Sequence, residues 1–238
     1  MRKSIIIALP VILLWIPFSV LPGQVVKDVD GNEYKTVTIG TQVWLAENLK
    51  TTRYSDGTPL VNVKDRDEWA NLTTPAYCWY NNDVNNSSKY GNLYNWFAVD
   101  PNSNGGKNLC PEGWHVPAEN DWSVLLHFLY NNGYGFEGER RSVAKSLADT
   151  TGWKLHDVAG NVGTQQEINN KTGFTALPAG YRNFRGEFTN LVSYSYWWTS
   201  TENSEMKARY RFMHNYYSYV GKGDFRKQNG FSVRCLKD

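Results

Sequence analysis

Cysteine, histidine and net charge are all scarce in this sequence of 238 residues. It holds three cysteines and four histidines, and 25 basic residues stand against 23 acidic ones. The cysteines, Cys78, Cys110 and Cys235, lie far apart, whereas a zinc site pairs its ligands a few residues apart. No histidine has another two to four positions away. The sequence therefore predicts neither a metal site nor a cofactor.

Common catalytic and metal-binding motifs are also missing. There is no Gly-x-Ser-x-Gly nucleophile elbow and no phosphate-binding loop. Asp28 and Asp30 open a stretch resembling a calcium loop, but Glu33 replaces the required glycine and Ile39 the acidic twelfth ligand. We interpret that stretch as a hairpin turn. These absences favour a protein that is not an enzyme.

Long apolar runs are limited to the N-terminus. Arg2 and Lys3 precede an apolar stretch at residues 5–20, which is shorter than the roughly 20 residues of a membrane span. A small residue, Gly23, ends the segment. Residues 1–23 are therefore predicted to be a signal peptide and residues 24–238 the exported domain, secreted or held at the cell surface. The alternative is an uncleaved N-terminal anchor; the mature chain holds no predicted membrane span.

Removal of residues 1–23 takes away two basic residues and no acidic one, so the remaining chain has no formal net charge. A basic surface for nucleic acid is not supported. Export permits a disulfide bond, and an odd number of cysteines leaves one thiol free or in an intermolecular bond. Cys110 and Cys235 each adjoin a strong local motif, so we expect these two to pair.

Aromatic residues, in contrast, are abundant at 15% of the chain, with 10 Trp and 15 Tyr. So many rings are hard to bury with every hydroxyl and indole N–H paired. We expect some to form a binding surface in the C-terminal third. Its candidate residues are Trp197, Trp198, Tyr210, Tyr216, Tyr217 and Tyr219. The alternative is that these rings are core residues or cross-strand pairs.

The hydrophobic pattern predicts an α+β domain. Turn residues punctuate predicted strands at residues 25–43, and strands separated by glycine-rich turns follow Phe174. A helix is predicted from about Ala118 to Tyr130, and a second from about Glu139 to Ala148. The first carries apolar residues at helical spacing, namely Trp122, Leu125, Leu126 and Leu129. We expect a single domain with small antiparallel sheets, two main helices and long loops.

Several ordered motifs resemble those of one family, the Fibrobacter succinogenes major paralogous domain (FISUMP) family. The segment at 110–117 reads Cys-Pro-Glu-Gly-Trp-His-Val-Pro, and that at 230–235 reads Gly-Phe-Ser-Val-Arg-Cys. The other matching segments are residues 30–34, 39–49, 90–96, 173–182 and 196–202. Relatives usually carry Thr or Ser where this chain has Ala118, so its predicted helix lacks a capping hydroxyl.

The resemblance implies a fold, because this family is in turn similar to sulfatase-modifying (formylglycine-generating) proteins, which have a variant of the C-type lectin fold. The similarity rests on residues 117–122 and the closing Gly-Phe…Arg-Cys segment. Enzymes of that type use a copper-binding cysteine pair, whereas the cysteines here are widely separated. The calcium-binding triplets of sugar-binding C-type lectins, Glu-Pro-Asn or Gln-Pro-Asp, do not occur.

These observations favour a secreted, non-catalytic binding or adhesion module, with an extracellular polysaccharide or a surface protein as partner. Two alternatives remain. One is a cofactor-dependent modifying enzyme of the formylglycine-generating type, and the other is a purely structural surface protein.

Overall fold

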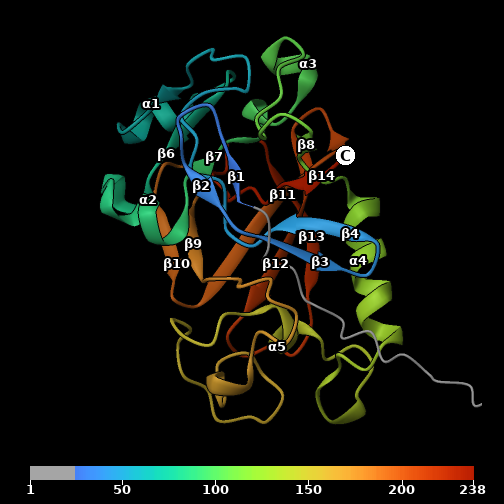
Figure 1. The fold of residues 1–238 in the computed structure, drawn as a ribbon. Helices are drawn as coiled ribbons and strands as arrows, with labels where there is room; N and C mark the ends of the chain where they lie inside the picture. The colour runs from blue at the N-terminus through green and yellow to red at the C-terminus, as the bar shows by residue number, and fades with distance from the viewer. Residues whose placement is uncertain (1–24) are drawn as a thin grey trace, which may run out of the picture.

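A computed structural model describes residues 25–238 of the protein. The fold is α+β, with more sheet than helix (Figure 1). Within the described residues only one helix, α4 (Glu119–Asn131), is longer than two turns. The shorter helices are α1 (Arg66–Ala70), α2 (Asn85–Tyr90), α3 (Pro101–Asn104) and α5 (Ala144–Leu147).

The prediction of a second main helix is wrong in extent. The segment predicted as residues 139–148 is helical only in the four residues of α5. It is preceded by a turn in which Glu137 and Gly138 have φ values of 48° and 85°. Glu139, which follows that turn, has an extended backbone (φ −68°, ψ 101°), so the helix does not begin there and the chain enters α5 only after Val143.

The largest sheet has five strands in the order β10-β9-β11-β12-β13. Its pairs are antiparallel except for β9 and β11, which are parallel where Gly180 meets Ser195. The strands are β9 (Ala179–Arg182), β10 (Phe188–Leu191), β11 (Tyr194–Ser204), β12 (Lys207–His214) and β13 (Gly221–Arg226). Because side chains alternate along a strand, this sheet presents two chemically distinct faces.

Three smaller sheets complete the architecture. One orders its strands β3-β4-β14-β8, the second β5-β6-β7, and the third pairs β1 with β2. Their strands are β1 (Val26–Lys27), β2 (Glu33–Tyr34), β3 (Thr36–Ile39), β4 (Gln42–Leu45), β5 (Val61–Asn62), β6 (Ala76–Cys78), β7 (Leu93–Tyr94), β8 (Trp114–His115) and β14 (Leu236–Lys237). The strands predicted within residues 25–43 are thus present.

Residues 230–237 link these sheets. Residues Gly230, Phe231 and Ser232 form single bridges with Arg182, Tyr94 and Trp197, respectively. A few residues later, β14 pairs with both β4 and β8. One short segment therefore lies against the five-stranded sheet and also completes the four-stranded one.

A cluster of large rings fills the space on one side of the five-stranded sheet. In Figure 1 the β3–β4 hairpin crosses in front of this sheet and α4 runs along its side. The Trp122 ring of α4 lies 5.1 Å from that of Trp44 and 5.6 Å from that of Trp197. Phe174 contacts all three rings. The predicted apolar stripe of α4 is confirmed, since all four of its residues are buried.

The start of α4 also agrees with the prediction. Ala118 is the N-cap residue, with an extended backbone and no capping bond from its side chain. Its backbone N–H donates to Oδ2 of Asp121, 2.8 Å away. Half of a capping box is therefore formed, and the half that needs a hydroxyl at position 118 is missing.

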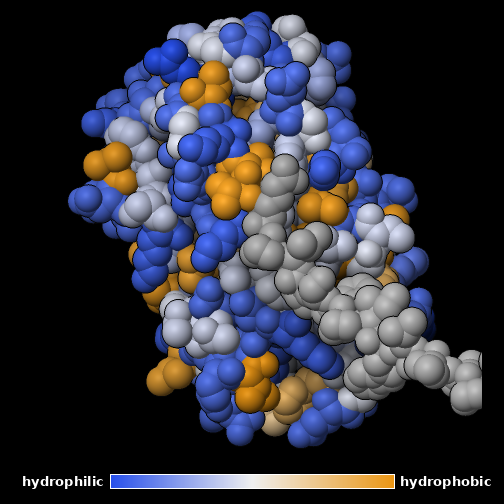
Figure 2. Space-filling view, viewed as in Figure 1, coloured by the Kyte–Doolittle hydropathy of each residue, from blue (hydrophilic) through white to orange (hydrophobic). Residues whose placement is uncertain are grey.

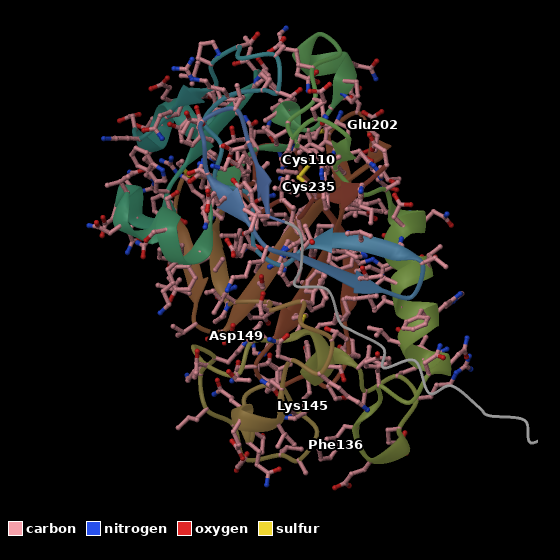
Figure 3. The ribbon with its side chains drawn as sticks, in the orientation of Figure 1. Cys110, Phe136, Lys145, Asp149, Glu202 and Cys235 are labelled. Atoms are coloured by element: carbon pink, nitrogen blue, oxygen red, sulfur yellow. A yellow bond between two sulfur atoms is a disulfide. The ribbon has the colours of Figure 1, made fainter. Side chains whose placement is uncertain are left out.

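The expected disulfide is present. Cys110 and Cys235 are bonded, with their Cα atoms 5.9 Å apart and their positions 125 residues apart in the sequence (Figure 3). Cys78 is a free, fully buried thiol. Burial raises its pKa to about 12, so the thiol stays protonated and unreactive at neutral pH.

Asp28 organises the turn that resembles a calcium loop. Its carboxylate accepts hydrogen bonds from the backbone N–H groups of Asp30 and Asn32 and from the Tyr34 hydroxyl.

No helix within residues 25–238 is long and apolar enough to cross a membrane. The molecular face in Figure 2 is mostly hydrophilic, with its apolar residues in separate small groups.

Candidate functional site

One face of the five-stranded sheet is paved with aromatic rings that remain partly exposed. Its members, here called the aromatic face, are Tyr181, Tyr194, Tyr210, Phe212 and Phe225. They come from strands β9, β11, β12 and β13. Trp197 and Met213, which alternate with them, pack on the other side against α4 and β4. The aromatic face therefore points away from the β3–β4 hairpin.

Two glycines of β13 allow the rings to lie over the sheet. Gly221 pairs with Phe212 and Gly223 with Tyr210. A Cβ atom built on Gly221 would lie 2.2 Å from the Phe212 ring, and one on Gly223 would lie 2.8 Å from the Tyr210 hydroxyl. The rings occupy the space that side chains on β13 would need. The sequence Gly-Lys-Gly-Asp-Phe thus makes room for aromatic side chains on the neighbouring strand.

The rings form a continuous array with contacts from strand to strand. Tyr210 and Phe225 are nearly parallel, with centroids 5.2 Å apart, and Tyr181 lies 6.1 Å beyond Phe225. Phe231, from the linking segment, is fully buried beneath them and contacts Tyr181, Tyr210 and Phe225. The exposed rings are therefore supported from below and held in fixed positions.

The hydroxyl groups of this face remain protonated at neutral pH. Burial raises the pKa of Tyr181, and burial together with neighbouring Tyr181 and Asp224 raises that of Tyr210. Burial and the adjacent Tyr216 raise the pKa of Tyr194. A protonated phenol both donates and accepts hydrogen bonds. The surface thus combines flat apolar rings with polar groups at their edges.

The turn after β12 extends this surface. It carries Tyr216, Tyr217 and Tyr219, here called the tyrosine turn, and Tyr216 and Tyr219 are 43% and 42% exposed. Tyr217 stacks on Tyr219 at 4.8 Å, and its ring lies 6.3 Å from that of Phe212. The structure therefore brings the predicted residues Tyr210, Tyr216 and Tyr217 into one neighbourhood.

His214 supports the junction between the aromatic face and the tyrosine turn. Its ring contacts those of Tyr194 and Tyr216, with centroids 3.6 and 3.5 Å away. Nδ1 of His214 accepts a hydrogen bond from the backbone N–H of Tyr216. Burial, together with His156 and Lys154, lowers the pKa of His214 to about 4. The ring is therefore neutral at pH 7 and belongs to the packing of the turn.

Two residues of the predicted surface do not lie on it. Trp197 and Trp198 are both fully buried. The indole N–H of Trp197 donates to Oδ1 of Asn48, and that of Trp198 donates to the carbonyl oxygen of Tyr94. Both rings are core residues with paired N–H groups, so the prediction that they form a binding surface is wrong.

Comparison with protein families assigns the chain. Residues 37–237 match the model of the Fibrobacter succinogenes major domain. The protein belongs to this family. No curated protein and no solved structure matches the chain.

In this member of the Fibrobacter succinogenes major domain family, the sequence prediction missed four rings of the aromatic face. These are Tyr181, Tyr194, Phe212 and Phe225. Tyr194 and Tyr196 lie two residues apart, as do Tyr210 and Phe212, and side chains at this spacing lie on the same face of a strand. That pattern would have indicated the aromatic face. The glycines at 221 and 223, two residues apart, point to the same place.

The side chains present also bear on the copper chemistry implied by the resemblance to sulfatase-modifying proteins. That chemistry needs two thiolates on one metal ion. In the structure Cys110 and Cys235 are bonded to each other, and Cys78 is buried apart from them. The three cysteines of this domain therefore do not present a copper-binding pair. Within residues 25–238 there is no cluster of three or more His, Cys, Asp or Glu side chains able to hold a metal ion.

Proposed function

We propose that this protein is a secreted, non-catalytic binding module whose aromatic face binds an extracellular polysaccharide. In this proposal residues 1–23, which lie outside the described residues, act as the signal peptide, and residues 24–238 form the exported domain. The fold would be a variant of the C-type lectin fold, shared with the sulfatase-modifying proteins. The observation that carries the proposal is the array of supported, partly exposed rings on one sheet face.

The chemistry of the rings favours a sugar chain. Sugar rings have flat, weakly polar faces that stack on aromatic side chains, and their hydroxyls bond to groups at the ring edges. The sheet fixes the positions of the rings before binding, so little side-chain freedom is lost when a ligand is bound. A row of rings across four strands suits an extended ligand better than a compact one.

Binding to insoluble plant polysaccharides and to a cell-wall glycan array tests the proposal. Replacement of Tyr210 or Phe225 by Leu keeps apolar volume but removes the flat ring. Each variant should bind the retained glycan at least about fivefold more weakly, the equivalent of roughly 1 kcal/mol per ring. Tyr134→Leu, which changes a ring packed beside Phe128 of α4, is the matched control and should bind as the parent does.

Retention of no glycan, or equal binding by all three variants, would contradict the proposal. A protein partner is the second candidate, because exposed Tyr rings also anchor protein interfaces. If a surface protein were bound in place of glycan and the same Leu variants weakened it, the site would stand and the ligand class would change.

A further inference from the structure

A second site lies on the opposite side of the five-stranded sheet from the aromatic face. It is a cleft of about 640 Å³, bordered by β3, by residues 46–50, by the end of α2 and by the loop at 173–177. Its volume falls in the range of small-molecule sites. Asp149, one of its lining residues, lies where the lower loops meet the sheets (Figure 3). The cleft is built from segments far apart in the sequence.

The floor of the cleft contains a buried cation that forms no close ion pair. Arg234 lines the cleft and is 1% exposed. It donates hydrogen bonds to Oδ1 of Asn48 and to the carbonyl oxygen of Phe174, and its guanidinium lies 4.3 Å from the centre of the Phe174 ring. No described carboxylate lies within 4 Å of it, but Glu47 and Asp149 attract its charge from further away and partly oppose the effect of burial, which lowers its pKa to about 9. Burial of a charge is costly where no carboxylate is in close contact, and an anion in the cleft would supply a closer counter-ion.

The walls carry charges of both signs. Lys35 and Lys89 line the cleft and are exposed. Lys50 is paired with Glu47, with Nζ and Oε2 3.0 Å apart. Asp149 is the second acid. With Arg234 the lining holds four basic and two acidic residues, so an anion is favoured overall while two carboxylates remain as hydrogen-bond acceptors.

The backbone of the wall is held in an unusual conformation. Thr175, which lines the cleft, has a φ of 51°, a value that β-branched residues rarely adopt. Its hydroxyl donates to the carbonyl oxygen of Ala46, and its N–H donates to Oδ1 of Asn170. Such strain persists only where surrounding contacts enforce it, and it is concentrated at functional sites. Here it aims the Phe174 carbonyl oxygen at Arg234.

We propose that this cleft binds a sugar acid, a ligand with one carboxylate and several hydroxyl groups. The carboxylate lies toward Arg234 and the rim lysines, where it places a negative charge near the buried guanidinium. The hydroxyls donate hydrogen bonds to the carboxylates of Glu47 and Asp149. These carboxylates would repel an anion that has no hydroxyl group to donate, such as sulfate. The ligand is either a free uronic acid or the uronate residue of an acidic polysaccharide. This site does not depend on the function proposed for the aromatic face.

Isothermal titration calorimetry of the folded protein with galacturonate, galactose and trigalacturonate tests the proposal. Galacturonate should bind at least about tenfold more tightly than galactose, its neutral counterpart. Trigalacturonate distinguishes the sources, since tighter binding than the monomer indicates a polysaccharide and equal binding a free sugar acid. Failure of both acids to bind better than galactose would overturn the proposal.

Variants of the rim locate the binding without removing the buried guanidinium. The double variant Lys35→Ala/Lys89→Ala changes exposed residues only and should weaken galacturonate binding about tenfold. Lys207→Ala, an exposed lysine on β12, is the control and should leave it unchanged. Unchanged binding by the double variant would place the ligand elsewhere and contradict the assignment. Tyr210→Leu should bind galacturonate as the parent does, so failure of the aromatic-face proposal is separable from failure of this one.

Discussion

Oδ1 of Asn48 lies 2.8 Å from Nη2 of Arg234, although 186 positions separate the two residues in the sequence. The same oxygen accepts a hydrogen bond from the indole N–H of Trp197. The amide nitrogen of Asn48 donates to the carbonyl oxygen of Tyr90 and to the Ser232 hydroxyl. One buried amide thus satisfies donors and acceptors from three distant parts of the chain.

Replacement of Asn48 by Ala should therefore lower the free energy of unfolding by about 3 kcal/mol or more, because a buried guanidinium and an indole N–H lose their acceptor. Chemical denaturation measures the effect. Asn85→Ala, a change at an exposed position in α2, is the control and should cost less than about 0.5 kcal/mol. Equal midpoints for the two variants would show that Asn48 has no such role.

The missing half of the capping box at α4 leads to a stabilising substitution. Ala118→Thr adds a hydroxyl that can accept a hydrogen bond from a backbone N–H of the first turn, and it should raise the free energy of unfolding by about 1 kcal/mol. Thermal melting of the variant checks this. Ala118→Val has a similar shape without the hydroxyl and should show no such gain. A Thr variant that melts no higher than the Val variant would contradict the capping argument.

The disulfide should contribute strongly to stability because it closes a long stretch of chain. Cys110 and Cys235 are 125 positions apart, and loss of such a bond costs about 2–5 kcal/mol. The Cys110→Ser/Cys235→Ser double variant should show a corresponding decrease in urea denaturation. Thiol titration supplies the control: the parent should expose one reactive thiol, Cys78, and only after unfolding. Reaction of a thiol in the folded parent would be inconsistent with this arrangement.

His214 should make the fold sensitive to acid. Its pKa is about 4 in the folded protein and about 6.5 in an unfolded chain. The unfolded state therefore binds a proton first as the pH falls. The contribution of His214 to the free energy of unfolding is constant above pH 6.5. It decreases from there down to pH 4, by up to about 3 kcal/mol.

Denaturation curves of His214→Gln across this pH range measure that contribution. The variant should lose much of the acid sensitivity between pH 6.5 and pH 4, since Gln does not titrate. His127→Gln, at an exposed position on α4, should keep the parental profile. A His214→Gln variant with the same pH profile as the parent would rule out His214 as the source.

The sequence was most informative where local chemistry and tertiary structure agree. The apolar stripe from Trp122 to Leu129 predicted α4 correctly, because that stripe is the face buried against the sheet. The family motifs around Cys110 and Cys235 likewise predicted the disulfide. The second helix was overestimated because Glu139 has an extended backbone and helical residues begin only at Ala144.

The composition of the chain does not distinguish aromatic residues of the surface from those of the core. Trp197 and Trp198 are neighbours on one strand, so their side chains point to opposite faces of the sheet and cannot form one surface. Both faces of the sheet are covered at these two residues. Residues of α4 and Trp44 cover the face of Trp197, and Phe231 covers the face of Trp198. The cleft at Arg234 was not predicted either, because its walls come from segments that only the folded chain brings together.

The position of residues 230–237 sets the order in which this chain can fold. This segment touches Tyr94, Arg182 and Trp197 and supplies the strand between β4 and β8. A polypeptide emerging N-terminus first from a ribosome leaves those partners with unpaired strand edges until residues 230–237 are synthesised. Such edges invite pairing with other molecules. The chain is therefore more exposed to aggregation before residues 230–237 are in place than after they have paired.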